Sequence, residues 1–178
     1  MPLRVLDEAG EGNVDNVVRG IDYAIRAGAR VINLSFVGNN PDTELDAAVT
    51  RAFEAGVLVV GAGGNDSVQH GLNLDKTPLY PVCSNGGSTD RIIGVASTDG
   101  RDLRSSFSNF GAKCIDLSAP GEGIYSTQLF DPAFSKFSKP YSGFWNGSSL
   151  AAPIVSGAAA LVLSVKPELT VTQVRDIL

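Results

Sequence analysis

Several features that mark other protein classes are absent or scarce in this chain of 178 residues. Lys and Arg total 14 against 19 Asp and Glu, and the net charge of −5 argues against nucleic acid or an anionic membrane as the partner. No signal peptide is visible. The most apolar run, residues 150–165, is short for a bilayer and contains Pro, Ser and Gly, so we reject a membrane span.

The composition is otherwise that of an ordinary soluble globular domain. Hydrophobic residues make up 43% and charged residues 19% of the chain, which is long enough for one domain with a sizeable core. Glycine is abundant, with 20 residues, and this predicts tight loops and close backbone approaches.

Strand and helix patterns alternate over the first 60 residues. Apolar runs predict strands over residues 3–6, 30–36 and 57–60, and helical spacing predicts helices from residue 14 to Gly28 and over residues 41–55. This alternation predicts a parallel sheet covered by helices. In such sheets, functional sites collect at the C-terminal ends of the strands.

The remaining elements are shorter. We expect a Gly/Ser/Asn loop over residues 84–88, strands over 91–96 and 114–117, a turn at 119–121, and a last helix over 170–178 capped by Thr170. Residues 129–141 contain four aromatic residues interleaved with Lys136 and Lys139. We interpret them as a surface hairpin that covers the core, in preference to a nucleic-acid site, because the chain is acidic.

The stretch 146–160 is the most informative one. Asn146 and Gly147 lead into Ser148 and Ser149, and the apolar run that follows predicts a helix buried on every side. A serine on the first turn faces unpaired N–H groups, which stabilise developing negative charge. Pro153 has no N–H and leaves the Ser149 carbonyl without its helical partner. On the pattern alone, an ordinary N-cap is the commoner explanation of the serine pair.

Residues 147–157 resemble the nucleophile motif of the subtilisin-like serine peptidases (subtilases), G-T-S-x-A-x-P-x-V-x-G. The matching positions are Gly147, Ser149, Ala151, Pro153, Val155 and Gly157, and Ser148 replaces the usual Thr. The resemblance implies that Ser149 is the nucleophile.

Residues 31–35, with the sequence V-I-N-L-S, resemble the strand of that family whose continuation pairs with the extended substrate backbone. The resemblance implies that Ser35, Phe36, Val37 and Gly38 bind substrate. The family usually continues with L-G-G, and Val37 in place of a glycine leaves the shape of the specificity pocket open; the chain predicts only a modest apolar pocket. The alternative is an ordinary core strand.

Residues 56–66 resemble the segment that ends in A-G-N, whose asparagine donates a hydrogen bond to the oxyanion. Asn65 is the matching residue, and Ala62, Gly63 and Gly64 would form one wall of the primary specificity pocket. The alternative is a dinucleotide fingerprint opened by Gly61. It finds little support, because Asp66 occupies the third glycine position and no helix pattern follows.

Cys83 and Cys114 are the only cysteines and match two positions that form a disulfide in some secreted subtilases. The alternative is two free buried thiols. A disulfide would imply an oxidising compartment, so we expect a secreted or extracytoplasmic protein. Asp116 lies where some relatives hold a calcium ion, but one carboxylate does not define a metal site, and we expect no required cofactor.

The triad of such peptidases runs Asp, His, Ser along the chain, and its first two members have no match here. His70 lies after Asn65 and outside the motif H-G-T-x-x-A-G, and Asp99-Gly100 also lies too far downstream. The resemblance therefore implies a subtilisin-like three-layer fold whose N-terminal strands are missing, with residues 1–178 as one partial catalytic domain.

Three hypotheses follow. In the first, this chain is the C-terminal part of a serine endopeptidase that cleaves polypeptides, with Asp and His on an N-terminal segment absent from this chain. The expected partners are polypeptide substrates and the missing N-terminal catalytic segment or a prodomain. In the second, it is a pseudopeptidase that binds peptides without cleaving them. In the third, a second chain supplies the base to a self-complementing assembly. Without a base, the Ser149 hydroxyl remains a poor nucleophile.

Overall fold

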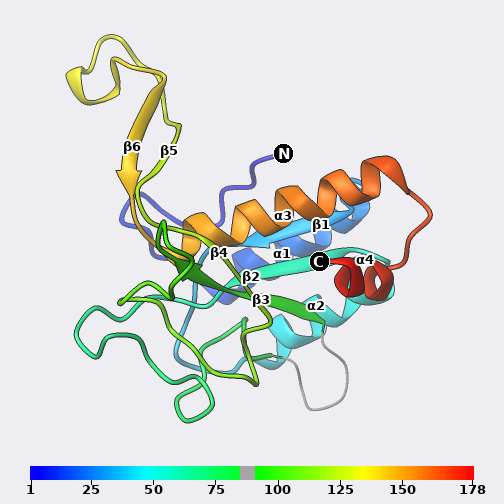
Figure 1. The fold of residues 1–178 in the computed structure, drawn as a ribbon. Coiled ribbons are helices and arrows are strands. Elements are labelled where there is room, and N and C mark those ends of the chain that lie inside the picture. The colour runs from blue at the N-terminus through cyan, green and yellow to red at the C-terminus, as the bar shows by residue number, and fades with distance from the viewer. Residues whose placement is uncertain (85–90) are drawn as a thin grey trace.

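A parallel four-stranded sheet forms the centre of the molecule in the computed structural model, which describes residues 1–84 and 91–178 (Figure 1). The strands are β1 (Val31–Leu34), β2 (Leu58–Ala62), β3 (Ile92–Thr98) and β4 (Leu117–Pro120), and they lie in the order β1-β2-β3-β4. Each neighbouring pair is parallel. Every residue of β2 and β3 is buried, as expected for central strands covered on both faces.

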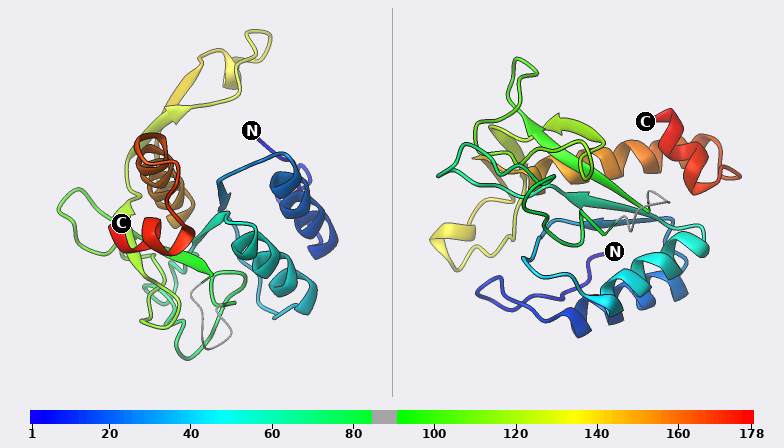
Figure 2. Two further views of the ribbon diagram at one scale, coloured as in Figure 1. Left: turned by 90° about the vertical axis from the view of Figure 1, so that its right-hand side faces the viewer. Right: turned by 90° about the horizontal axis from the view of Figure 1, so that it is seen from below.

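Helices cover both faces of the sheet, which confirms the predicted three-layer arrangement (Figure 2). The helices α1 (Val14–Arg26) and α2 (Thr43–Glu54) cover one face, and α3 (Ser148–Val165) covers the other, followed by the short α4 (Val171–Ile177). One apolar cluster joins the sheet to α1 and α2, and a second joins it to α3 and α4. These two clusters form the core on the two faces of the sheet.

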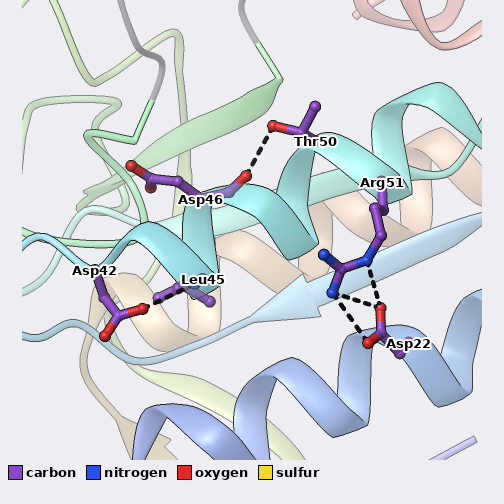
Figure 3. Close-up of polar contacts among 6 residues, drawn as sticks. All are labelled: Asp22, Asp42, Leu45, Asp46, Thr50 and Arg51. Carbon is purple, nitrogen blue, oxygen red and sulfur yellow. Dashed lines mark hydrogen bonds and ion pairs between the residues drawn. The ribbon is translucent and has the colours of Figure 1, made fainter.

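Polar contacts lie at the surface of α1 and α2 (Figure 3). Asp42 caps α2 by accepting hydrogen bonds from the backbone amides of Glu44 and Leu45, both at 2.9 Å. The Arg51 guanidinium forms an ion pair with Asp22 of α1 at 2.9 Å. Because both side chains are partly exposed, this pair contributes little, on the order of 0–1 kcal/mol. Burial of the apolar faces therefore dominates the packing of the two helices.

Two predicted strands differ from the observed ones. Residues 3–6 form no strand, because they pair with no neighbouring strand among the described residues; together with α1 and β1 they line a cavity of about 580 Å³. The strand predicted over 114–117 begins only at Leu117, because the amides of Cys114 and Ile115 turn to the carbonyl of Gly111. The Ala119-Pro120 pair, predicted as a turn, ends this strand. Of the loop predicted over 84–88, all but Ser84 lies outside the described residues.

The predicted surface hairpin exists but does not cover the core. It consists of β5 (Ile124–Thr127), β6 (Tyr141–Trp145) and a short 3-10 helix, η1 (Ser135–Phe137), in the connection between them. β5 and β6 pair only with each other, so the hairpin projects from the body of the molecule (Figure 1). Most of its aromatic side chains are exposed, with 62% of Phe134 and 53% of Tyr141 accessible.

Helix α3 is buried on one side only, which corrects the prediction of an all-round buried helix. Ala151, Ala152 and Ala159 are fully buried against the sheet, whereas Leu161 is 70% and Val165 79% exposed. Nothing in the described part of the chain packs on this outer face. By length and composition, α3 is the one described helix that could cross a membrane, but its inner face forms part of the core.

Candidate active site

Gly147 places the two serines at the C-terminal edge of the sheet. It is the N-cap residue of α3, and its φ of 154° and ψ of 151° form a backbone conformation that only glycine adopts readily. A Cβ atom here would lie 2.9 Å from Ser149 Oγ and 3.5 Å from Asn65 Nδ2. The hydroxyl of Ser149 and the amide of Asn65 therefore face the same small space.

The orientation of Asn65 follows from its hydrogen bond to the start of α3. The Ser148 backbone N–H donates to Asn65 Oδ1 at 2.8 Å. Because an N–H requires an acceptor, the carbonyl oxygen of the amide must take this position. The Nδ2 group, which is a donor, is then directed to the space beside Gly147.

Neither serine caps α3, so the N-cap explanation of the pair is not supported. Ser148 is fully buried, and its Oγ accepts a hydrogen bond from the Gly64 amide at 3.0 Å. This bond ties the start of α3 to the segment after β2. A hydroxyl is needed at this position, which explains why Ser can replace Thr in the motif.

The Ser149 carbonyl has no helical donor, because Pro153 has no N–H. It accepts a hydrogen bond from the segment after β1 instead. Ser35 Oγ donates to the Ser149 carbonyl at 3.0 Å. Ser35 Oγ in turn accepts from Asn33 Nδ2 at 2.8 Å, and Asn33 Oδ1 accepts from the Ser156 hydroxyl at 3.0 Å. A chain of three hydrogen bonds thus fixes the backbone of Ser149.

Sequence reasoning missed Asn33 and Ser156 as members of this chain. Asn33 belongs to the V-I-N-L-S stretch, and its spacing of two residues from Ser35 was a usable signal, because i and i+2 share one face of a strand. Ser156 had no comparable signal, since its contact with Asn33 spans 123 residues.

The four residues predicted to bind a substrate backbone divide into two groups. Gly38 is already paired: its amide donates to the Tyr80 carbonyl at 2.7 Å, and its carbonyl accepts from the Tyr80 amide at 2.9 Å. Ser35 uses its hydroxyl on Ser149. Among the described residues, no hydrogen bond engages the backbone of Phe36 or Val37. The backbone N–H and C=O groups of these two residues are therefore available to pair with another extended segment.

Ala62, Gly63 and Gly64, which the resemblance assigns to one wall of the specificity pocket (the glycine wall), lie directly beside the start of α3. Gly63 donates its amide to the Val95 carbonyl and accepts from Asn109 Nδ2, both at 2.9 Å. Gly64 has a φ of 85°, which favours glycine. Residues 66–84 contain turns and isolated bridges but no helix, so the dinucleotide alternative lacks the helix that it requires.

Asn109 is a third residue that sequence reasoning left without a role. It is 1% exposed; its Nδ2 binds the Gly63 carbonyl, and its Oδ1 accepts from the Leu72 amide at 2.8 Å. The Nδ2 end of the amide therefore holds Gly63, and the Oδ1 end holds the loop at Leu72.

The only histidine does not approach the serine as a base. His70 lies in an exposed loop with a left-handed backbone (φ 53°), and its side chain makes no hydrogen bond with Ser149 in the described part of the chain. Cys83 and Cys114 are joined in a disulfide, the pairing that the resemblance implies.

No cluster of metal ligands is found among residues 1–84 and 91–178. The carboxylate of Asp116 accepts from the Gly94 amide at 2.7 Å and pairs with Arg175 of α4. Asp116 therefore joins the start of β4 to both β3 and the last helix.

Comparison with known proteins agrees with this geometry. The chain is 38% identical over 174 residues to subtilisin DY from Bacillus licheniformis and 38% identical over 179 residues to an extracellular serine proteinase from a Thermus species. The match to subtilisin DY covers 98% of this chain but only 57% of that relative. The match to the Thermus proteinase covers 39% of that relative.

Solved structures give the same result. A cold-adapted subtilisin-like serine proteinase matches 97% of this chain with a TM-score of 0.78 and 33% identity, and the match covers 56% of that protein. A lanthipeptide protease matches the whole chain with a TM-score of 0.82 and 27% identity. The family model described as the subtilase family matches residues 1–178, and the chain therefore belongs to the subtilases.

Proposed function

We propose that the complete protein is a serine endopeptidase that cleaves polypeptides by acyl transfer through Ser149. The observation that carries the proposal is the shared space beside Gly147, which Ser149 Oγ and Asn65 Nδ2 both face. A nucleophile and an oxyanion donor must be arranged in this way around the carbonyl that is attacked.

In the proposed reaction, Ser149 Oγ attacks the substrate carbonyl carbon. The oxyanion that forms accepts hydrogen bonds from Asn65 Nδ2 and from the backbone N–H of Ser149 on the first turn of α3. The substrate lies extended along Phe36 and Val37, whose backbone groups are available for strand addition. Water then releases the acyl group from Ser149.

The proton of Ser149 must go to a base, and we assign this role to a histidine on a polypeptide segment outside this chain, oriented by an aspartate on the same segment. The position of His70 supports this assignment, because His70 lies far from Ser149 in the sequence and in an exposed loop. So does the length of the chain, which covers 57% of subtilisin DY. The histidine then returns the proton to the leaving amine.

Two uncovered surfaces fit such a segment. The outer face of α3 exposes Ile154, Leu161 and Val165. The outer edge of β1 has no paired strand in the described part of the sheet. A segment that adds a strand to β1 and packs a helix on α3 would bury both surfaces and bring its side chains to the edge of the sheet where Ser149 lies.

A second candidate is a peptide-binding protein without catalysis. The free backbone of Phe36 and Val37 and the rigid glycine wall support it, because both can hold a peptide when no base is present. The disulfide and the relative described as extracellular support a location outside the cytoplasm for either candidate. Neither candidate requires a cofactor.

The test is peptide hydrolysis by this chain fused behind the N-terminal part of subtilisin DY, which supplies the aspartate and histidine. We expect hydrolysis that Ser149→Ala abolishes and that His70→Ala leaves unchanged. Hydrolysis that survives Ser149→Ala would contradict the proposal, and binding of peptide by a folded fusion without any turnover would favour the second candidate.

A further inference from the structure

Two side chains of the protein already lie against Gly64, one of the residues expected to form the wall of the specificity pocket. A Cβ atom on Gly64 would lie 3.1 Å from Val37 Cγ2 and 3.3 Å from Leu79 Cδ1. Val37 lies in the segment after β1, where the substrate backbone is proposed to bind. Leu79 lies in the loop directly before Tyr80. Both therefore lie against Gly64, one of the three residues expected to form the wall of the specificity pocket.

The two side chains are held in this position by the surrounding structure. Leu79 is 8% exposed and belongs to a buried cluster with Leu74, Val82 and Cys114, against which Val37 packs. The paired hydrogen bonds between Gly38 and Tyr80 join the residues directly after Val37 and Leu79. The disulfide joins Cys114, a member of the same cluster, to Cys83, which packs against it.

The wall itself is equally fixed. Asn109 Nδ2 would lie 2.7 Å from a Cβ atom on Gly64, and it binds the Gly63 carbonyl at 2.9 Å. Moving the backbone of Gly63 and Gly64 away would break this buried hydrogen bond, which would cost free energy. Any widening of the pocket requires Val37 and Leu79 to move instead.

We propose that Val37 and Leu79 fill the primary specificity pocket, so that this protein accepts only polypeptides with a small residue (glycine, alanine or serine) on the acyl side of the reactive carbonyl. This inference rests on the site of the proposed function and names its substrate class. A large side chain would have to displace two packed apolar groups, and such overpacking opposes binding.

The experiment measures peptide binding to the 178-residue chain, so it does not depend on catalysis. Two acetylated tetrapeptide amides, identical except for alanine or phenylalanine at the last residue, are titrated into ¹⁵N-labelled protein. The amide signals of Gly63 and Gly64 report binding. We expect the alanine peptide to bind at least about tenfold more tightly, a discrimination typical of pocket size.

Substitution should reverse this preference. In Val37→Gly/Leu79→Ala, the phenylalanine peptide should gain at least about tenfold in affinity, and the milder Val37→Gly alone should give part of that gain. Leu74→Ala is the matched control, because Leu74 is buried in the same cluster but is not among the atoms nearest to Gly64. It should leave the ratio of the two affinities unchanged.

Three results would overturn the inference: equal or tighter binding of the phenylalanine peptide by the natural chain, an unchanged ratio in the folded double variant, or no perturbation of Gly63 and Gly64 by either peptide. Hydrolysis by the fusion with the subtilisin DY segment is measured separately. Size-dependent binding without hydrolysis would contradict the peptidase proposal and support this one.

Discussion

Pro153 and Ser35 show how single residues position Ser149, the proposed nucleophile. Proline at position 153 removes the helical partner of the Ser149 carbonyl, and the Ser35 hydroxyl replaces it at 3.0 Å. The first turn of α3 is thereby attached to the segment after β1, a contact that spans 114 residues. The position of Ser149 thus depends on a side chain that is not part of its own helix.

A double-mutant cycle tests this exchange. Ser35→Ala should lower the free energy of unfolding by about 1 kcal/mol, because one part-buried hydrogen bond is lost. In a Pro153→Ala background the same change should cost less, since the restored N–H at position 153 can donate to the Ser149 carbonyl. Denaturant unfolding of the four proteins measures both effects, and equal costs in the two backgrounds would contradict the exchange.

Asn65 is the residue whose loss should act on turnover rather than on substrate binding. In the fusion with the subtilisin DY segment, Asn65→Ala should lower kcat on the order of a hundredfold or more, the size established for this type of donor in subtilisin itself. KM should change little, because the donor meets an oxyanion that exists only during reaction. A change confined to KM would assign Asn65 to substrate binding.

At this scale the sequence marks some positions of the candidate site and misses others. Ser149, Asn65 and Gly147 occupy motif positions, and the structure brings them to one small space. Asn109, Leu79 and Ser156 contact the site from distant parts of the chain, and their roles depend on tertiary contacts that no local pattern contains. Gly38 shows the opposite case, since its pairing with Tyr80 removes it from the predicted edge.

Among the elements, the helices and central strands could be predicted because their apolar periods and caps are local. The strand predicted over residues 3–6 was wrong, because a strand needs a neighbour and the sequence pattern does not contain one. The outer face of α3 is apolar in sequence but exposed in the described molecule. Its pattern is that of a helix covered on more than one side.

The turn after β3 gives the molecule a pH-sensitive element. Hydrogen bonds from the Arg101 amide, the Arg101 side chain and the Leu103 amide lower the pKa of Asp99. A carboxyl whose pKa is lower in the folded state stabilises it at neutral pH, and this contribution is lost as the pH falls below the value in the unfolded chain, about 4.

The measurement compares the natural chain with Asp99→Asn between neutral pH and about pH 2, below the ordinary value of an aspartate. We expect the natural chain to be the more stable one at neutral pH and the difference to shrink as the pH falls below about 4. Because this carboxyl is near the surface, the effect should also decrease at high salt. A difference that does not vary with pH would contradict the assignment.

For the whole molecule, the disulfide is the strongest single constraint on the unfolded chain. Cys83 and Cys114 are 31 residues apart. Closing a loop of that size should contribute about 3–4 kcal/mol in the chain-entropy model. Cys83→Ser/Cys114→Ser should therefore lower the free energy of unfolding by about this amount, and unfolding with and without reductant checks it. Equal stability of the two forms would show that the bond constrains nothing.

The uncovered face of α3 predicts how the isolated chain behaves. Leu161→Glu should reduce self-association of this chain in sedimentation, because it places a charge in the exposed apolar face. The same change should weaken function when the subtilisin DY segment is present, since that segment must then bury the charge. Asp15→Asn, on the surface of α1, is the control and should do neither. Stronger association of Leu161→Glu would contradict the role of this face.

The central claim is that Ser149 is a complete nucleophile that lacks only its base. The most direct measurement is the intact mass of the chain after exposure to a fluorophosphonate, alone and as the fusion that supplies the aspartate and histidine. We predict no adduct on the isolated chain and one adduct on the fusion that Ser149→Ala removes. An adduct on Ser149 of the isolated chain would contradict the claim that its base comes from outside the chain. A folded fusion that remains unlabelled would contradict the claim that Ser149 is the nucleophile.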